Sequence, residues 1–404
     1  MKISVAVLFG GKSVEHEVSV ISAVQAMANL DETKYEIIPV YITKSDEMWS
    51  GEALRDIENY KDIPALLRRC QPVGFHVRGD KTYLDTEVSG LFSKRTSRAI
   101  DLGFPIAHGT HVEDGALQGF LDTVNLPYVG SDVLASAVGM DKFVQKTLLR
   151  QGGFPVLPGS RFSTADWSSG TIAQSVEADY SYPVMVKPVN LGSSVGIGRA
   201  NTPDELRSCL DLAFSFASQV VVEPAVSNLR EINCAVLGDA DAAEASECEE
   251  PTAVHAMLTY EDKYGGAGRP AGAKSEGSKS DGSKNPASPG RRIPADITPE
   301  QRQQIRGLAV DAFRYLRLCG VTRIDFLMDA ATGEIWLNEV NTIPGSLAFY
   351  LWAPLGVSYP ELLDRLIGLA LKRQRQTEDL TYAFDTNILA NSAAGTKATK
   401  ASQT

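Results

Sequence analysis

Three features are scarce in this 404-residue sequence, and each scarcity excludes a class of protein. Basic residues are outnumbered, with 39 Lys and Arg against 50 Asp and Glu and a net charge of −11, which argues against a general nucleic-acid binder. No apolar run reaches the 18 residues of a membrane-spanning helix, and the apolar start Ile3–Phe9 is too short for a secretory core. The five cysteines are scattered without a CxxC pair, which disfavours a disulfide framework or zinc cluster and predicts a reducing cytoplasm.

The apolar pattern of the first forty residues is that of an α/β protein. ISVAVLF is an apolar run that ends at Gly10-Gly11, apolar residues then recur at helical spacing from Val18 to Met27, and EIIPVYI follows as a second apolar run. A strand, a glycine-rich turn, a helix and a further strand begin an open parallel sheet. A further strand is predicted near 99–109.

The rest of the chain divides by composition. We expect an N-terminal α/β domain over 1–130, a central domain over 131–222 and a C-terminal domain over 223–373. Residues 265–292 are rich in Gly, Ser, Ala, Lys and Pro, which predicts a flexible loop, and 374–404 is predicted to be a disordered tail. The acidic segment 239–250 receives no assignment.

The most informative stretch is VTRIDFLMDAATGEIWLNEVNT, two alternating runs around a turn at Asp329–Gly333 that predict a β-hairpin. Alternate residues of a strand project from the same face. The side chains of Arg323 and Asp325 should therefore share one face of the first strand, and those of Glu339 and Asn341 one face of the second. If the register joins these faces, two carboxylates and an amide oxygen meet, which are ligands suited to Mg²⁺. A solvated strand face is the alternative.

Two further patterns suggest phosphate contacts. Lys187 precedes the loop Gly192–Gly196, and backbone N–H groups of such a loop can hold phosphates, although it is not a GxxxxGK[ST] sequence and a plain turn is the alternative. Lys142 begins a predicted helix as a second candidate, with a surface lysine as its alternative.

Polar residues also follow two predicted strands of the N-terminal domain, the first strand and the strand near 99–109. Glu15 lies in the first turn of the helix after Gly10-Gly11, where the helix dipole alone would favour a glutamate. His108 and the Glu113-Asp114-Gly115 cluster follow the strand near 99–109, where a helix cap and turn is the alternative. Both loops lie at the sheet edge where open α/β sheets bind ligands.

Taken together and in order, these motifs resemble the D-alanine–D-alanine ligase family of ATP-grasp enzymes. The resemblance spans residues 3–372 and implies a three-domain ATP-grasp architecture of α/β (α+β) class. It rests on eight collinear segments: FGGKSVEHEVS (9–19), HGTHVEDGALQGFLDTVNLPYVGS (108–131), MDK (140–142), VKPVNLGSSVGI (186–197), VVEPAVSNLREI (221–232), TYEDKY (259–264), TRIDFLMD (322–329) and NEVNTIPGS (338–346).

The resemblance implies a role for each matching residue. ATP would be bound by Lys142, Lys187, Ser194, Glu223, Pro224, Val226 and Glu231, and two Mg²⁺ ions, or Mn²⁺, by Asp325, Glu339 and Asn341. The catalytic set would be Glu15, Ser193, Tyr264, Arg323 and Gly345, and the amino-acid substrates would contact His108, Lys263 and Tyr350.

The implied reaction joins two D-alanines through an acyl phosphate for peptidoglycan synthesis, in a cytoplasmic homodimer with no nucleic-acid or membrane partner. Tyr350 stands where many relatives have a serine for the second carboxylate, and the loop after Tyr264 is unusually rich in Gly, Ser and Lys. A ligase with another acceptor is therefore the first alternative. A non-catalytic ATP-binding protein is the second.

Overall fold

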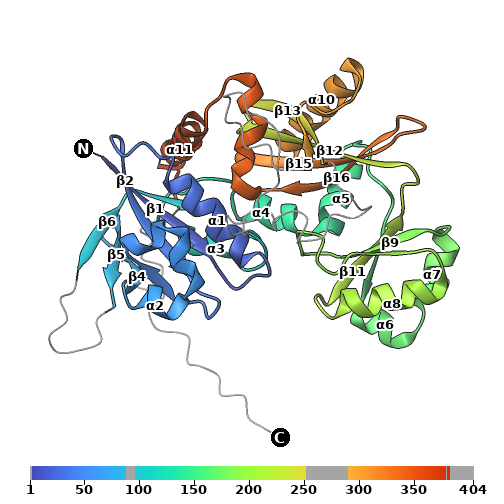
Figure 1. Cartoon of the computed structure of the whole chain (residues 1–404), viewed down its shortest axis with the longest axis horizontal. Coiled ribbons are helices and arrows are strands. Elements are labelled where there is room, and N and C mark those ends of the chain that lie inside the picture. Colours follow the sequence, from blue (N-terminus) through green and yellow to red (C-terminus); the bar gives the residue numbers. More distant parts are fainter. Residues whose placement is uncertain (1, 88–95, 252–289, 379, 383–404) are drawn as a thin grey trace, which may run out of the picture.

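The computed structural model describes residues 2–87, 96–251, 290–378 and 380–382. It contains three β-sheets that follow one another along the chain and are flanked by helices (Figure 1). In the part of the chain that the structure describes, no helix combines the length and apolar character needed to cross a membrane.

The first sheet has seven strands in the order β6-β5-β4-β3-β2-β1-β7. Its centre, β2-β1-β7, is parallel as predicted, whereas β3 to β6 pair antiparallel, so the sheet is mixed rather than parallel throughout. Its elements are β1 (Ile3–Gly10), α1 (His16–Met27), β2 (Tyr35–Ile42), β3 (Met48–Ser50), η1 (Glu52–Arg55), η2 (Ile57–Lys61), α2 (Ile63–Leu67), β4 (Gln71–Arg78), β5 (Lys81–Thr86), β6 (Ser97–Ile100), β7 (Leu102–Pro105) and α3 (Ala116–Thr123).

Strand β1 is buried on both faces because each face packs into a different core. Val5, Val7 and Phe9 belong to a core shared with α1 and the C-terminal helix, and Ala6 and Leu8 to a core on the opposite side. The period of two in a strand explains this division. A strand covered on both faces is apolar at consecutive positions, which is why the sequence identified it so clearly.

The second sheet has the order β10-β9-β11-β8 and is antiparallel. Figure 1 shows it at the lower right, with α6, α7 and α8 beside β9 and β11. The elements from residue 133 onward are α4 (Val133–Met140), α5 (Lys142–Gln151), β8 (Ser160–Ser163), α6 (Thr164–Ser169), α7 (Ile172–Asp179), β9 (Val184–Pro188), β10 (Gly198–Ala200), α8 (Pro203–Phe214) and β11 (Gln219–Pro224). Helices α4 and α5 adjoin strand β16 of the third sheet.

The third sheet has the order β14-β13-β12-β15-β16 and is also antiparallel. The predicted hairpin is confirmed, since β15 and β16 pair across the turn at Asp329–Gly333. The elements are β12 (Leu229–Gly238), β13 (Ala243–Pro251), β14 (Arg291–Arg292), α10 (Pro299–Tyr315), β15 (Gly320–Asp329), β16 (Ile335–Asn341), η4 (Gly345–Leu351), η5 (Ala353–Leu355) and α11 (Tyr359–Glu378).

Two sequence-based boundaries need correction. Arg291 and Arg292, placed in the flexible loop, form β14 beside β13, where Arg291 Nε lies 3.3 Å from a carboxylate oxygen of Glu249. Composition alone does not reveal this ion pair. The unassigned acidic segment is largely strand β13, and α11 continues to Glu378, past the predicted start of the tail. Most of the predicted loop and tail lies outside the described residues.

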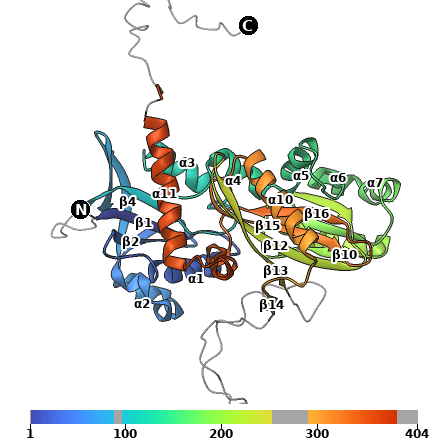
Figure 2. The same ribbon diagram turned by 90° about the horizontal axis from the view of Figure 1, so that it is seen from above.

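Helix α11, near the C-terminal end of the described residues, packs against the N-terminal strand β1. Its residues Leu362, Leu363, Leu366, Ile367 and Ala370 share the core that contains Val5 and Val7. Figure 2 shows the helix running alongside the first sheet, next to α1 and β1. The N-terminal sheet is therefore anchored to the C-terminal part of the chain. The second sheet lies at the opposite end of the molecule from the first sheet (Figure 1).

Candidate active site

A cavity of about 530 Å³ lies between the second and third sheets. The segments that line it come from β9, the loop after it, the connection from β11 to β12, and β15 and β16. The structure brings these predicted residues together on the lining: Lys187, Ser194, Glu223, Pro224, Val226, Glu231, Asp325 and Glu339. Its size suits a nucleotide-like ligand, since ligand pockets typically measure about 300–1,000 Å³.

The register of β15 and β16 unites the predicted metal ligands. Asp325 lies opposite Glu339 and Arg323 opposite Asn341, as the strand-face argument required. Arg323 binds Asp325 through two contacts, Nε to Oδ1 at 2.6 Å and Nη2 to Oδ2 at 2.7 Å. The amide of Asn341 donates to Asp325 Oδ2 at 3.1 Å.

This donor set fits a hard divalent cation. Two carboxylates and one amide group lie together, and Mg²⁺ sites of this kind draw their remaining ligands from water and substrate phosphates. Within residues 2–87, 96–251 and 290–378, no three His, Cys, Asp or Glu side chains gather as a metal cluster. The fit therefore depends on oxygen ligands that include Asn341 and a phosphate-bearing substrate.

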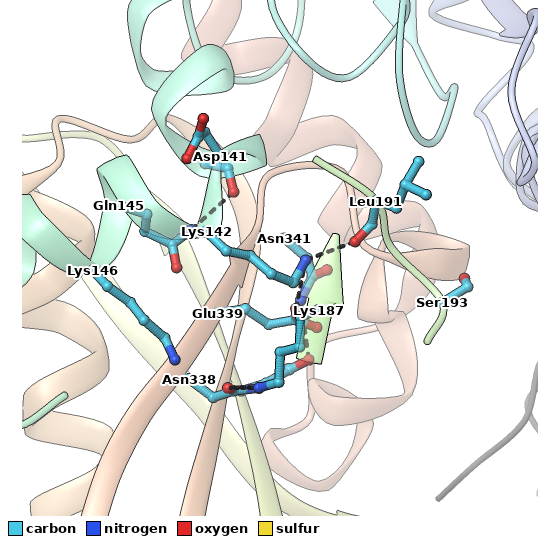
Figure 3. A network of polar contacts seen from close by, with 12 residues as sticks. Asp141, Lys142, Gln145, Lys146, Lys187, Leu191, Ser193, Asn338, Glu339 and Asn341 are labelled. Carbon is cyan, nitrogen blue, oxygen red and sulfur yellow. Dashed lines mark hydrogen bonds and ion pairs between the residues drawn. The ribbon is translucent and has the colours of Figure 1, made fainter. Parts of the chain in front are cut away.

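Two predicted lysines, Lys142 and Lys187, lie near Glu339, and Figure 3 shows their side chains together with it. Nζ of Lys142 lies 2.7 Å from the carbonyl oxygen of Leu191 and 3.1 Å from Glu339 Oε2. Lys142 is the first residue of α5, whose start is capped because the Asp141 carboxylate accepts from two backbone N–H groups. The cap fixes the direction from which Lys142 enters the site.

Glu223 is 1% exposed and binds both Lys187 and Lys146. Burial by itself would raise the pKa of this carboxyl, but the two ammonium groups outweigh it and lower the pKa of Glu223 to about 2. Burial lowers the pKa of Lys146 to about 8 despite the attraction of Glu223. The trio carries one excess positive charge at the back of the cavity, which favours an anionic ligand.

Sequence reasoning missed Lys146 and Asn338. Lys146 follows Lys142 by four residues, so both lie on one face of α5, and this spacing is a signal the sequence does contain. Asn338 Oδ1 accepts from Lys187 Nζ at 3.0 Å. The register of β15 and β16 shifts between Asp325 and Phe326, so a β-bulge lets Asn338 and Glu339 both line the cavity, which strict alternation does not predict.

The loop after β9 closes against the start of α1. Ser193 donates a hydrogen bond to Glu15 Oε1. A Cβ on Gly192 would lie 2.7 Å from a carboxylate oxygen of Glu15, so a larger residue there would displace the Glu15 carboxylate. The predicted Glu15–Ser193 contact is present, whereas the third member, Tyr264, and its neighbour Lys263 lie outside the described residues.

His108 is 3% exposed and does not line the cavity. Its Nδ1 lies 2.7 Å from the carbonyl oxygen of Ile343 and its Nε2 lies 3.0 Å from Ser22 Oγ. Burial, with the nearby charge of Arg323, lowers the pKa of His108 to about 4. The imidazole is therefore neutral at pH 7 and connects two segments of the chain.

Glu113 is a further buried carboxyl that the sequence suggested only as part of a turn. Its two oxygens accept from the backbone N–H groups of Ile343 at 2.9 Å and Gly109 at 3.1 Å. Burial, and then the charge of Glu15, raise the pKa of Glu113 to about 7. Glu113 and His108 thus hold the same residue, Ile343, the first at its N–H and the second at its carbonyl oxygen.

The remaining predicted residues lie at the end of β16. Gly345 begins η4, and Tyr350 near its end lies under the guanidinium of Arg291, whose carbon is 4.3 Å from the ring centre. Arg323 interacts electrostatically with both Tyr350 and Arg291. Arg323 therefore links Tyr350 to the predicted metal ligand Asp325, and the η4 segment that carries Gly345 and Tyr350 packs against α1.

Two sheets that close on a cavity lined by Lys187 and several carboxylates define the ATP-grasp class of fold. The chain belongs to the D-alanine–D-alanine ligase family: family models described as D-ala D-ala ligase N-terminus and C-terminus match residues 4–131 and 148–368. Membership implies small-molecule substrates, with ATP and a divalent metal ion.

Curated relatives and solved structures agree with this family. The D-alanine–D-alanine ligase of Pelodictyon phaeoclathratiforme is 38% identical over 380 residues, which cover 93% of this chain and 99% of the relative. The solved D-alanine–D-alanine ligase from Coxiella burnetii is 30% identical with a TM-score of 0.73, covering 93% and 97% of the two chains. The VanG D-Ala:D-Ser ligase from Enterococcus faecalis is also 30% identical, with a TM-score of 0.72 and coverages of 92% and 100%.

Proposed function

We propose that this protein joins two molecules of D-alanine into D-alanyl-D-alanine with conversion of ATP to ADP and phosphate, for peptidoglycan precursor synthesis. The observation that carries the proposal is that one cavity unites Lys187 and Ser194 with Asp325 and Glu339. The near full-length match to D-alanine–D-alanine ligases supports it.

In this proposal the β11–β12 connection holds the nucleotide. Backbone groups from Glu223 to Val226 meet the adenine edge and Glu231 binds the ribose hydroxyls, which fits their common position on the cavity lining. Lys142, Lys187 and Ser194 reach the phosphates. Two Mg²⁺ ions, which Mn²⁺ can replace, are held by Asp325, Glu339 and Asn341 and supply charge neutralisation during phosphoryl transfer.

The amino-acid side of the site would act in two steps. Glu15, held by Ser193, pairs with the ammonium of the first D-alanine, whose carboxylate oxygen attacks the γ-phosphorus and displaces ADP. The amine of the second D-alanine then attacks the acyl phosphate carbon, loses a proton, and phosphate leaves with the electrons of the broken C–O bond. Arg323 stabilises the transferred group, and the Gly345 N–H stabilises the oxyanion.

Tyr350 would face the second D-alanine, and Lys263 and Tyr264 would cover the substrates and exclude water that hydrolyses the acyl phosphate. We also propose a homodimer in the cytoplasm, on the resemblance of the whole chain to this family. The scattered cysteines agree with a reducing compartment.

The test is phosphate release by the purified protein with ATP and Mg²⁺, with products identified by mass spectrometry. D-alanine alone should yield D-alanyl-D-alanine. The alternative of another acceptor, suggested by Tyr350, is less favoured because the curated relatives are D-alanine–D-alanine ligases. Product formed only when D-serine, D-lactate or an L-amino acid is added would overturn the proposal in favour of that alternative.

A further inference from the structure

The segment after β16 contains an unusual backbone. Ser346, Leu347 and Ala348 are three successive non-glycine residues with φ of 51°, 53° and 50°, directly after Gly345. L-amino acids adopt this left-handed conformation against a steric cost, and as single residues rather than runs. Such a conformation persists where the surrounding structure determines it, so its supports identify residues that shape the site.

One support is a chain of hydrogen bonds from the N-terminal domain. The backbone N–H of Ser346 donates to Ser22 Oγ at 2.9 Å. Ser22 Oγ lies 3.0 Å from His108 Nε2, and His108 Nδ1 lies 2.7 Å from the carbonyl oxygen of Ile343.

The direction of each bond follows from chemistry. The Ile343 carbonyl can only accept, so His108 Nδ1 carries the hydrogen, and a neutral imidazole then accepts at Nε2. Ser22 must therefore donate its hydroxyl hydrogen to His108 while its oxygen accepts from Ser346. Each donor in this series of hydrogen bonds therefore has an acceptor. Ser22 links the two halves, because its hydroxyl donates to His108 and accepts from the backbone N–H of Ser346.

The two ends of this chain, Ile343 and Ser346, flank Pro344-Gly345. Ser22 and His108 are 1% and 3% exposed, so water does not compete for these bonds. Ser22 belongs to α1, the helix that follows Glu15, and His108 follows β7. The N-terminal domain therefore fixes the Gly345 turn on both sides.

We infer that Ser22 is a positioning residue for peptide-bond formation, which aims the Gly345 N–H at the carbonyl under attack by the second amino acid. The inference rests on the proposed function. Phosphoryl transfer to the first carboxylate occurs at the lysines and metal ligands, whereas oxyanion stabilisation belongs to the later step. Loss of the Ser22 hydroxyl should therefore slow the second step selectively.

The experiment compares both steps in Ser22→Ala. Exchange of isotope between the β,γ-bridging and non-bridging oxygens of ATP, with D-alanine present, measures reversible acyl phosphate formation. Mass spectrometry measures D-alanyl-D-alanine. We expect dipeptide formation to fall at least about tenfold, less than the loss of a whole oxyanion donor, while isotope exchange changes by less than about twofold.

Matched variants separate positioning from general damage. Ser22→Thr keeps the hydroxyl and should recover most of the dipeptide rate. Ser136, on α4, is another buried serine, and its hydroxyl donates to the carbonyl oxygen of Ser131 at 3.4 Å. Ser136→Ala removes this hydroxyl and should behave as the wild type. If Ser22→Ala does not fold, Ser22→Cys provides the comparison because a thiol is a weak hydrogen-bonding group.

Three results would overturn the inference: wild-type dipeptide formation in Ser22→Ala, an equal loss of both steps, or a Ser22→Thr variant as slow as Ser22→Ala. Failure of the wild-type protein itself to form D-alanyl-D-alanine would instead refute the proposed function, so the two failures are distinguishable.

Discussion

Asn338 holds Lys187 across the cavity, with its Oδ1 3.0 Å from the lysine Nζ. The two residues are 151 positions apart and come from the third and second sheets. Lys187 also binds the buried Glu223, so Asn338 and Glu223 together direct its ammonium group. The β-bulge at Asn338 makes this contact possible.

This contact predicts that Asn338→Ala weakens nucleotide binding. A hydrogen bond to a charged group contributes about 1.5–3 kcal/mol, so affinity for ATP should fall roughly ten- to hundredfold. Isothermal titration calorimetry with ATP and Mg²⁺ measures the change. Asn201→Ala, at a surface asparagine that bonds Glu205, is the control and should keep wild-type affinity. Unchanged affinity in Asn338→Ala would show that Glu223 alone positions Lys187.

The buried trio of Lys146, Glu223 and Lys187 predicts energetic coupling. Lys146→Met leaves Glu223 with one ammonium partner and should lower the free energy of unfolding by up to about 3 kcal/mol. Urea denaturation of Lys146→Met, Glu223→Gln and the double variant forms a thermodynamic cycle. The double variant should be more stable than the sum of the single effects indicates, and strict additivity would contradict the coupling.

The facing carboxylates predict that Glu339→Gln removes turnover without unfolding the protein. Phosphate release should fall at least about a hundredfold because a ligand for the charge-neutralising metal is lost. Electron paramagnetic resonance of Mn²⁺ should show weaker metal binding in the same variant. Glu334→Gln, at the hairpin turn of the same strands, is the control. Wild-type metal affinity in Glu339→Gln would refute this assignment.

Glu113 and His108 predict opposite dependences of stability on pH. The pKa of Glu113 rises from 4.5 to about 7 on folding, so the native state binds the extra proton and loses stability as pH rises between these values. The pKa of His108 falls from 6.5 to about 4, so the unfolded state binds the proton and stability grows as pH rises through that window. In the wild type the two trends largely cancel between pH 4.5 and 6.5.

Glu113→Gln removes the loss of stability with rising pH and leaves the opposite trend due to His108. The stability of the wild type relative to this variant should fall by about 3 kcal/mol from pH 4.5 to 7. The variant itself should gain stability from pH 4 to 6.5 through His108. Denaturant unfolding at intervals of pH measures both curves, and parallel curves for the two proteins would contradict the shifted pKa of Glu113.

Much of the fold could be predicted from local pattern. β1 is apolar at every buried position, α1 shows helical spacing, and the turn at Asp329–Gly333 separates two alternating runs. The opposition of Asp325 and Glu339 followed from alternation and a hairpin of correct register. The antiparallel strands β3, β4 and β5 of the first sheet were missed because β3 is short and because β4 and β5 mix polar and charged residues with few apolar ones.

The sequence by itself determined the central elements β1, α1 and the hairpin, the family, and which hairpin residues share a strand face, because these depend on neighbours in the chain. Only the tertiary structure decided that Lys146 and Lys187 share Glu223, that a bulge turns Asn338 into the cavity, and that Ser22 and His108 hold the Gly345 turn. The physical reason is that burial and long-range contact set charge, direction and backbone strain, and no local pattern encodes which distant side chain will provide them.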